Sequence, residues 1–159
     1  MTTVFTTIAD FRDASGTELG AGPWLEVDQQ RISAFADVTE DWQWIHVDVE
    51  RAAKSPWGST VAHGYLTLSL LPRLSSGIFD FTGLGKVLNY GLDRVRFLAP
   101  VAPGDRLRAR AELVEVTDSG AGALGRVRYT VEIDGKERPA CVAEALMLAL
   151  PDDAGDDAR

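Results

Sequence analysis

Two short stretches of this chain bring together residue types that could act as acid, base and oxyanion donor. Asp41 and His46, a carboxylate and an imidazole that can both carry protons, lie five positions apart. His63 and Gly64 follow and open an apolar run, where a backbone N–H could face a developing oxyanion. The chain has only two histidines, and both lie in these stretches. Together the four residues could add water to an activated carbonyl compound or remove it.

Each of these residues also has a plain structural interpretation. An Asp can cap a helix, a His can lie on the surface, and a glycine such as Gly64 often serves a turn or close packing. The aromatic neighbours Trp42 and Trp44 favour a shared site, and Gln43 between them could orient a partner by hydrogen bonding. For His63 we predict an orienting or packing role rather than direct proton transfer.

Two helices are predicted to hold these stretches. Asp28 is a suitable N-cap for a helix whose apolar face includes Ile32 and Phe35. Residues 64–76 predict a mostly apolar and therefore buried helix, which Pro72 should kink. Further short helices are predicted at residues 9–16 and 48–54.

The second half of the chain has the pattern of an antiparallel sheet. Apolar and polar residues alternate over 105–116 and 126–133, as expected for strands with one buried face. Asp134 and Gly135 predict a hairpin turn before a central strand at 140–150. Further strands are predicted at 24–27 and 87–98. One buried helix against such a sheet is an α+β architecture.

Composition narrows the class of protein further. The 159 residues suit one domain over residues 1–150, followed by an acidic tail at 151–159 that we expect to be disordered. A net charge of −8 argues against a nucleic-acid partner. No apolar run reaches the roughly 20 residues that a membrane helix needs, and no signal peptide is recognisable. The lone Cys141 fits a buried apolar position. Without a recognisable membrane helix or signal peptide, we expect a cytoplasmic protein that has no membrane partner.

Several motifs, in order along the chain, resemble the MaoC-like dehydratase family of (R)-specific enoyl-CoA hydratases. The Asp-x-Gln-x-x-His signature begins at Asp41, and Ala-His-Gly-Tyr-Leu-Thr spans 62–67. The segments Val-Arg-Phe-Leu-Ala-Pro-Val-Ala-Pro-Gly-Asp at 95–105 and Arg-Pro-Ala-Cys-Val-Ala-Glu at 138–144 match as well. The chain is most similar to the nodulation protein N-like branch, which includes small mycobacterial dehydratases.

The resemblance implies a hot-dog fold, in which a curved antiparallel sheet wraps a long central helix, and a homodimer. It implies that Asp41 and His46 hold a catalytic water, that the Gly64 N–H forms the oxyanion hole, and that Gln43 and His63 support them. The implied substrate is an acyl-CoA or acyl-carrier-protein thioester, with no cofactor and no metal.

Four further residues are assigned to substrate binding: Trp44, Tyr65, Asn89 and Arg94. For Arg94, a solvated or ion-paired role is the alternative. Pro72 and Gln43 depart from the residues found in many relatives, so acyl length and the orienting contact stay open. Two other functions also stay open, a thioesterase of the same fold and a non-catalytic acyl-binding module. Hydration needs a proton delivered to C2 as well as one removed from water, and this favours a hydratase with paired Asp41 and His46.

Overall fold

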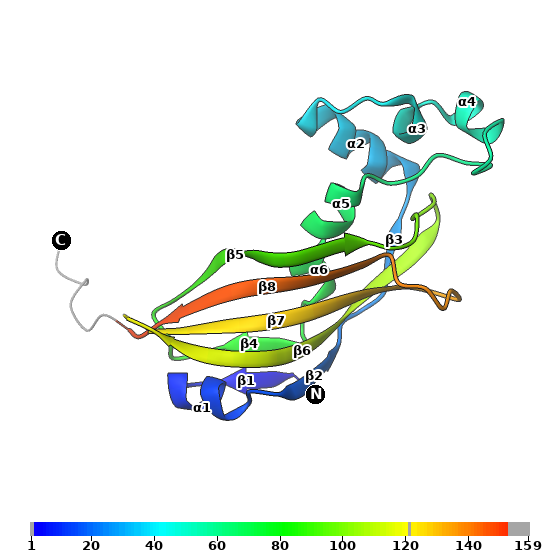
Figure 1. Cartoon of the computed structure of the whole chain (residues 1–159). Coiled ribbons are helices and arrows are strands. Elements are labelled where there is room, and N and C mark those ends of the chain that lie inside the picture. The colour runs from blue at the N-terminus through cyan, green and yellow to red at the C-terminus, as the bar shows by residue number, and fades with distance from the viewer. Residues whose placement is uncertain (1, 121, 153–159) are drawn as a thin grey trace.

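The structure is a computed structural model that describes residues 2–120 and 122–152. A curved antiparallel sheet forms its main part (Figure 1). The strand order is β2-β6-β7-β8-β5, and β3 also pairs with β6. The strands are β2 (Thr17–Ala21), β3 (Leu25–Val27), β5 (Lys86–Phe97), β6 (Asp105–Ser119), β7 (Gly122–Ile133) and β8 (Cys141–Leu150). Of the predicted tail, residues 153–159 lie outside the described part of the chain.

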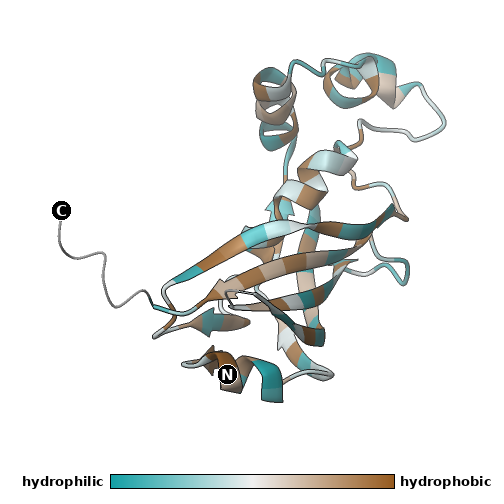
Figure 2. Ribbon diagram, turned by 60° about the vertical axis from the view of Figure 1, so that its left-hand side comes forward, coloured by the Kyte–Doolittle hydropathy of each residue, from teal (hydrophilic) through white to brown (hydrophobic). Residues whose placement is uncertain are grey.

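Alternation of side chains gives the sheet one buried face and one polar face. Along β7 every second residue is buried, and the residues between them are half-buried. Figure 2 shows the corresponding bands of apolar and hydrophilic residues along the strands. The predictions for 105–116 and 126–133 are therefore confirmed, and Gly135 adopts the positive φ of a turn at 73°.

Two consecutive helical segments, α5 (Gly64–Ser69) and α6 (Leu71–Leu74), pack against the buried face of the sheet. Leu66, Leu70 and Leu74 belong to the main core. The predicted single helix to residue 76 is thus interrupted at Leu70 and is shorter than expected. Pro72 explains the interruption, because it has no N–H to donate to the carbonyl four residues earlier.

Three helices stand above the sheet as an overhang, which we define as residues 29–62 (Figure 1). They are α2 (Gln29–Thr39), α3 (Trp44–Val47) and α4 (Val49–Ala53). The Asp28 carboxylate caps α2 by accepting a hydrogen bond from the Arg31 N–H at 2.8 Å, as predicted. Asp48 caps α4 in the same way through Arg51, whereas α3 was not predicted. No helix in the described residues is both long enough and apolar enough to cross a membrane.

The N-terminal residues close one end of the sheet. The strand β1 (Thr3–Phe5) pairs in parallel with β4 (Phe79–Phe81). Along the chain, α1 (Ile8–Asp13) lies between β1 and β2. The rings of Phe5, Phe11 and Phe81 form a cluster with centroids 5.1–5.3 Å apart, in which Phe11 meets each of the other two rings edge-on. Sequence patterning predicted α1 but not β1, β2 or β4.

Candidate functional site

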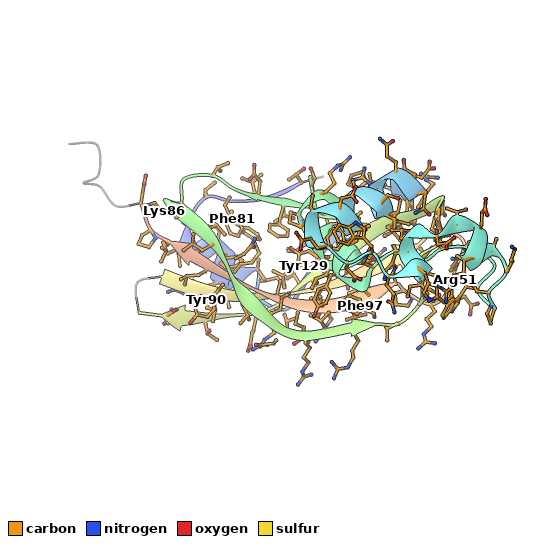
Figure 3. The ribbon with its side chains drawn as sticks, turned by 90° about the horizontal axis from the view of Figure 1, so that it is seen from above. Arg51, Phe81, Lys86, Tyr90, Phe97 and Tyr129 are labelled. Carbon is orange, nitrogen blue, oxygen red and sulfur yellow. The ribbon has the colours of Figure 1, made fainter. Side chains whose placement is uncertain are left out.

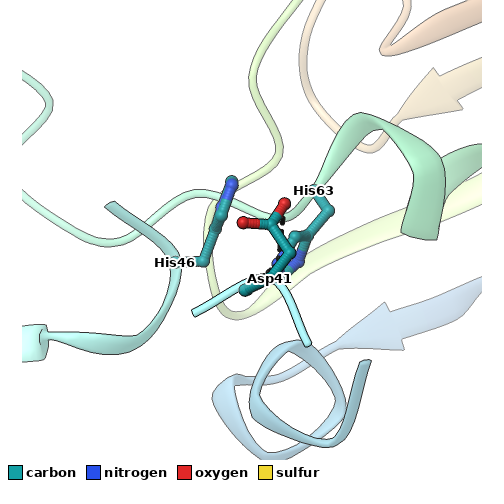
Figure 4. A group of neighbouring side chains, drawn as sticks. All are labelled: Asp41, His46 and His63. Carbon is teal, nitrogen blue, oxygen red and sulfur yellow. Dashed lines mark hydrogen bonds and ion pairs between the residues drawn. The ribbon is translucent and has the colours of Figure 1, made fainter. Parts of the chain in front are cut away.

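Asp41, His46 and His63 meet where the overhang joins α5 (Figure 4). Asp41 follows the C-cap of α2, Glu40, which adopts a left-handed conformation with φ of 58° and so turns the chain towards the site. His46 lies on α3, and His63 is the residue before α5. Their potential ligand atoms all lie within 4.8 Å of one another. The structure therefore brings together three residues that the sequence separates by up to 22 positions.

The ring of His46 is held in one orientation. Its Nδ1 lies 2.6 Å from the Val61 carbonyl oxygen, and the Val61 N–H donates to the Ile45 carbonyl at 2.9 Å. Because a carbonyl only accepts hydrogen bonds, Nδ1 must carry the proton, and Nε2 of the neutral ring keeps its lone pair. Burial lowers the pKa of His46 below its ordinary value, and nearby His63 adds to this, while the Val61 contact and the Asp41 charge oppose it. His46 is thus arranged as a neutral base.

His63 contacts both the backbone and the carboxylate of Asp41. Its Nε2 lies 3.0 Å from the Asp41 carbonyl oxygen and 3.9 Å from the Asp41 carboxylate. The ring stacks on His46, with centroids 3.7 Å apart, and packs against Phe35 at 5.1 Å. Its Nδ1 is buried and has no hydrogen-bond partner among the described residues. These contacts fit the predicted orienting role. Neither ring nitrogen is available to a substrate, because Nε2 faces the Asp41 carbonyl and Nδ1 is buried.

The Asp41 side chain is 56% exposed and can therefore reach a ligand. The Gln43 backbone N–H, rather than its side-chain amide, faces the Asp41 carboxylate at 3.4 Å. The Gln43 side chain is exposed, so the expected amide contact is replaced by a backbone one. The amide that does reach the site belongs to Gln29, whose Nε2 donates to the His46 carbonyl at 2.8 Å. Sequence reasoning missed Gln29, because no motif marks it.

Gly64 is the first residue of α5, so its N–H has no partner within the helix. A Cβ at this position would lie 2.9–3.0 Å from the ring of Phe97. A side chain at this position would therefore displace the Phe97 ring, which is a packing reason for glycine that is independent of any function. The oxyanion-hole role of the Gly64 N–H stays a prediction.

Two of the four residues predicted to bind the substrate, Trp44 and Tyr65, are close neighbours of His46 and Gly64 in the sequence. Trp44 is half-buried, with the Arg51 guanidinium 4.2 Å from its ring centroid, and Figure 3 shows Arg51 at the outer end of the overhang. Tyr65 is 72% exposed and meets Phe97 edge-on at 6.1 Å. The role of both side chains in substrate binding stays a prediction.

Asn89 lines a cavity of about 570 Å³ between the α5–α6 segment and the strands β5, β7 and β8. Leu68, Pro72 and Ser75 form its helical wall, and Tyr129 and Met147 lie opposite. Burial raises the pKa of Tyr129 to about 12, so its hydroxyl stays neutral near neutral pH. Gly91 also lines the cavity, and a Cβ there would meet open space. The size and mainly apolar lining suit an acyl chain.

Arg94 lies on the opposite face of the sheet from this cavity. It pairs with Glu144, which in turn pairs with Arg128, and paired residues share a face. Arg128 bonds Glu144 at 3.0 Å and Glu112 at 3.0 Å in a charged network on this outer face. Within one chain, the structure does not bring Arg94 together with Asp41 and His46.

Three donor groups in this arrangement could also approach a metal ion. However, the His63 nitrogen nearest Asp41 already faces the Asp41 carbonyl, and His46 Nδ1 faces Val61. A metal held by all three residues would have to displace the first of these contacts. The geometry therefore suits proton transfer better than metal ligation.

Comparison with known proteins places the chain in a family. Residues 10–134 match the family model described as MaoC like domain. The 3-hydroxyacyl-thioester dehydratase Z of Mycobacterium tuberculosis H37Rv is 47% identical over 144 residues, 90% of this chain and 95% of that protein. Nodulation protein N of Rhizobium leguminosarum is 48% identical over 149 residues, 89% of each chain.

Solved structures bear out the fold. An unliganded R-hydratase of Pseudomonas aeruginosa superposes with a TM-score of 0.73 at 22% identity, covering 92% of this chain and 86% of that one. The (R)-hydratase of A. caviae gives 0.69 at 22% identity, covering 86% and 96%. The predicted α+β hot-dog fold is confirmed. The chain belongs to the MaoC-like family and is an enzyme of its hydratase and dehydratase class.

Proposed function

We propose that this enzyme catalyses the reversible hydration of a trans-2-enoyl thioester to a (3R)-3-hydroxyacyl thioester, with residues 1–150 as its one domain. The observation that carries the proposal is the orientation of His46, whose Nδ1 is committed to Val61 so that the lone pair is left on Nε2 of a ring that lies close to the Asp41 carboxylate. The thioester substrate is supported by the name of the mycobacterial relative. We extend the proposal to either a CoA or an acyl-carrier-protein thioester.

The proposed reaction begins with a water held between Asp41 and His46. The water oxygen attacks C3 of the enoyl group while one of these side chains accepts its proton. The electron pair of the C2–C3 double bond moves towards the thioester, and negative charge develops on the thioester oxygen. The Gly64 N–H would stabilise that charge, and the Asp41–His46 pair would pass the proton taken from the water on to C2. Elimination of water follows the same path in reverse.

The acyl chain is proposed to occupy the 570 Å³ cavity. From Gly64 to Ser75 a helix would advance about 16 Å at 1.5 Å per residue. An extended chain advances about 1.2 Å per bond, so an acyl group of roughly ten carbons would cover about two thirds of this distance and one of roughly fourteen carbons would reach Ser75. Chains of this length should therefore bind better than a four-carbon chain.

A homodimer is proposed through β5. This strand lies at one edge of the sheet and, among residues 2–120 and 122–152, pairs only with β8. Its Leu88, Tyr90 and Phe97 side chains are 46%, 65% and 48% exposed. An open edge carrying apolar side chains is a natural surface for a second copy. The expected cytoplasmic location stays a prediction.

The test follows the absorbance of the conjugated enoyl thioester, with free thiol measured in parallel. Purified protein is added to trans-2-enoyl-CoA substrates of four to twelve carbons, with Asp41→Asn as the control. Loss of absorbance without thiol release, absent from the control, is the expected result. Thiol release would replace the proposal with a thioesterase. No change at any chain length would contradict an enzymatic role and favour an acyl-binding module.

A further inference from the structure

Gln29 connects two parts of the overhang that lie far apart in sequence. It is the first residue of α2, and its side chain is half-buried. Its Nε2 donates to the His46 carbonyl at 2.8 Å and to the Ser33 hydroxyl at 3.2 Å. Its Oε1 accepts a short hydrogen bond from the hydroxyl of Thr60, which is 1% exposed. The donor and acceptor ends of the amide are both used, which fixes its orientation.

The two ends of the Gln29 amide each hold a residue that helps to position the ring of His46. One end holds the backbone of His46 itself. The other end holds Thr60, which directly precedes Val61, and the Val61 carbonyl is the group that faces His46 Nδ1. Together with the hydrogen bond from the Val61 N–H to the Ile45 carbonyl, the Gln29 side chain therefore helps to set the distance between the His46 ring and its carbonyl partner.

We propose that Gln29 is a positioning residue that keeps His46 in the Nδ1–H tautomer by clamping residues 46 and 60 together. This inference rests on the proposed function, in which Nε2 of His46 serves the reacting water. Thr60 is the second half of the clamp. Ser33 lies outside it, because its contact with Gln29 stays within α2.

The experiment replaces each contact separately. Gln29→Met keeps the length of the side chain but removes all its hydrogen bonds, and Thr60→Val removes only the contact with Oε1. We expect each variant to lower kcat by about tenfold to a hundredfold with little change in KM, as misplaced support residues typically do. Because both changes break one clamp, the double variant should lose less than the product of the two losses. Ser33→Ala is the matched control and should keep the wild-type kcat.

A second measurement separates positioning from a merely structural role. Nitrogen chemical shifts of the His46 ring should report one Nδ1–H tautomer in the wild type and a mixture of tautomers in Gln29→Met, at temperatures where both proteins are folded. An unchanged kcat in Gln29→Met, or a reduced kcat with the wild-type tautomer, would overturn the inference. If the wild type hydrates no enoyl thioester, the proposed function fails, but the shifts still decide whether Gln29 sets the tautomer.

Discussion

The imidazole rings of His46 and His63 stack with their centroids 3.7 Å apart and their planes inclined by 25°. Both rings are buried, at 7% and 3% exposure. Burial and the neighbouring His63 ring therefore both disfavour a positive charge on His46 and lower its pKa. This pair keeps His46 in its neutral form, which is the form that can accept a proton from water.

The pH dependence of activity should show the lowered pKa of His46. We expect the acidic limb of kcat/KM to lie below pH 6.5, the ordinary value for histidine. The unfolded chain takes up this proton near pH 6.5, whereas the native protein takes it up only at lower pH. The free energy of unfolding should therefore fall as the pH drops through this interval. Denaturant unfolding from pH 7.5 to 5 measures this change, and in His46→Gln the dependence should weaken. A limb at or above pH 7 would contradict the expectation.

His46→Gln and Gln43→Ala should have very different effects although the residues are three positions apart. Loss of an acid–base group costs about a hundredfold to ten-thousandfold in turnover, so His46→Gln should nearly abolish hydration. The Gln43 side chain is exposed and only its backbone N–H contacts Asp41, so Gln43→Ala should keep most of the activity. Steady-state rates with one enoyl-CoA compare the two variants, and circular dichroism checks that both are folded. A large loss in Gln43→Ala would show that its amide acts in the complex.

Gly64→Ala should separate packing from oxyanion stabilisation when it is combined with Phe97→Leu. The new Cβ would lie 2.9 Å from the Phe97 ring, and such overpacking costs about 1–3 kcal/mol. Shortening Phe97 should return the free energy of unfolding towards the wild-type value. Turnover should stay at least about tenfold low, because the methyl group still shields the N–H from the thioester oxygen. If turnover recovered together with stability, position 64 would need glycine for packing alone.

Gly91→Leu should shorten the acyl chains that the enzyme accepts. A side chain at Gly91 meets no neighbour within 4 Å and would extend into the cavity. We expect kcat/KM for ten-carbon substrates to fall by about tenfold or more, while the rate with crotonyl-CoA, the internal control, stays near wild type. Gly91→Ala should give an intermediate result. Equal losses at all chain lengths would argue that the acyl group lies elsewhere.

Tyr90→Lys should weaken the proposed homodimer. Tyr90 is 65% exposed on β5, and a charge on a self-complementary edge is brought against the same charge of the second copy. Sedimentation velocity over a range of concentrations should show a shift towards the monomer. Val38→Lys, at a position 79% exposed on α2, is the control and should sediment like the wild type. A wild-type protein that is monomeric throughout would refute the dimer directly.

Much of the fold follows from local sequence patterns. The alternation in β6 and β7, the Asp28 cap and the break near Pro72 all depend on neighbouring residues, and all appear in the structure. The short strands β1, β2 and β4 have three to five residues each, too few for alternation to be visible. They form because the sheet and the aromatic cluster offer partners far away in sequence.

The candidate site was predictable in its main residues but not in its support. Asp41, His46 and His63 could be found from residue types and family motifs, and the structure places them together. The role of the Val61 carbonyl was invisible, because every residue carries the same backbone group. The Gln29–Thr60 contact spans 31 positions, and nothing in the local sequence marks either residue as a partner. Gln43 was predicted as an orienting residue from its place in the Asp-x-Gln-x-x-His motif, but its side chain is exposed and its backbone N–H makes the contact with Asp41.

The Gln29–Thr60 contact ties the overhang at its base, before the chain returns to the sheet. Asp41 and His46 therefore belong to a loop that this contact closes. The cavity proposed for the acyl chain is instead walled by α5, α6 and the strands. Substitutions in that wall can alter which substrates enter without moving the proton-transfer groups. A protein built in this way can diversify its substrates during evolution while its reaction stays the same.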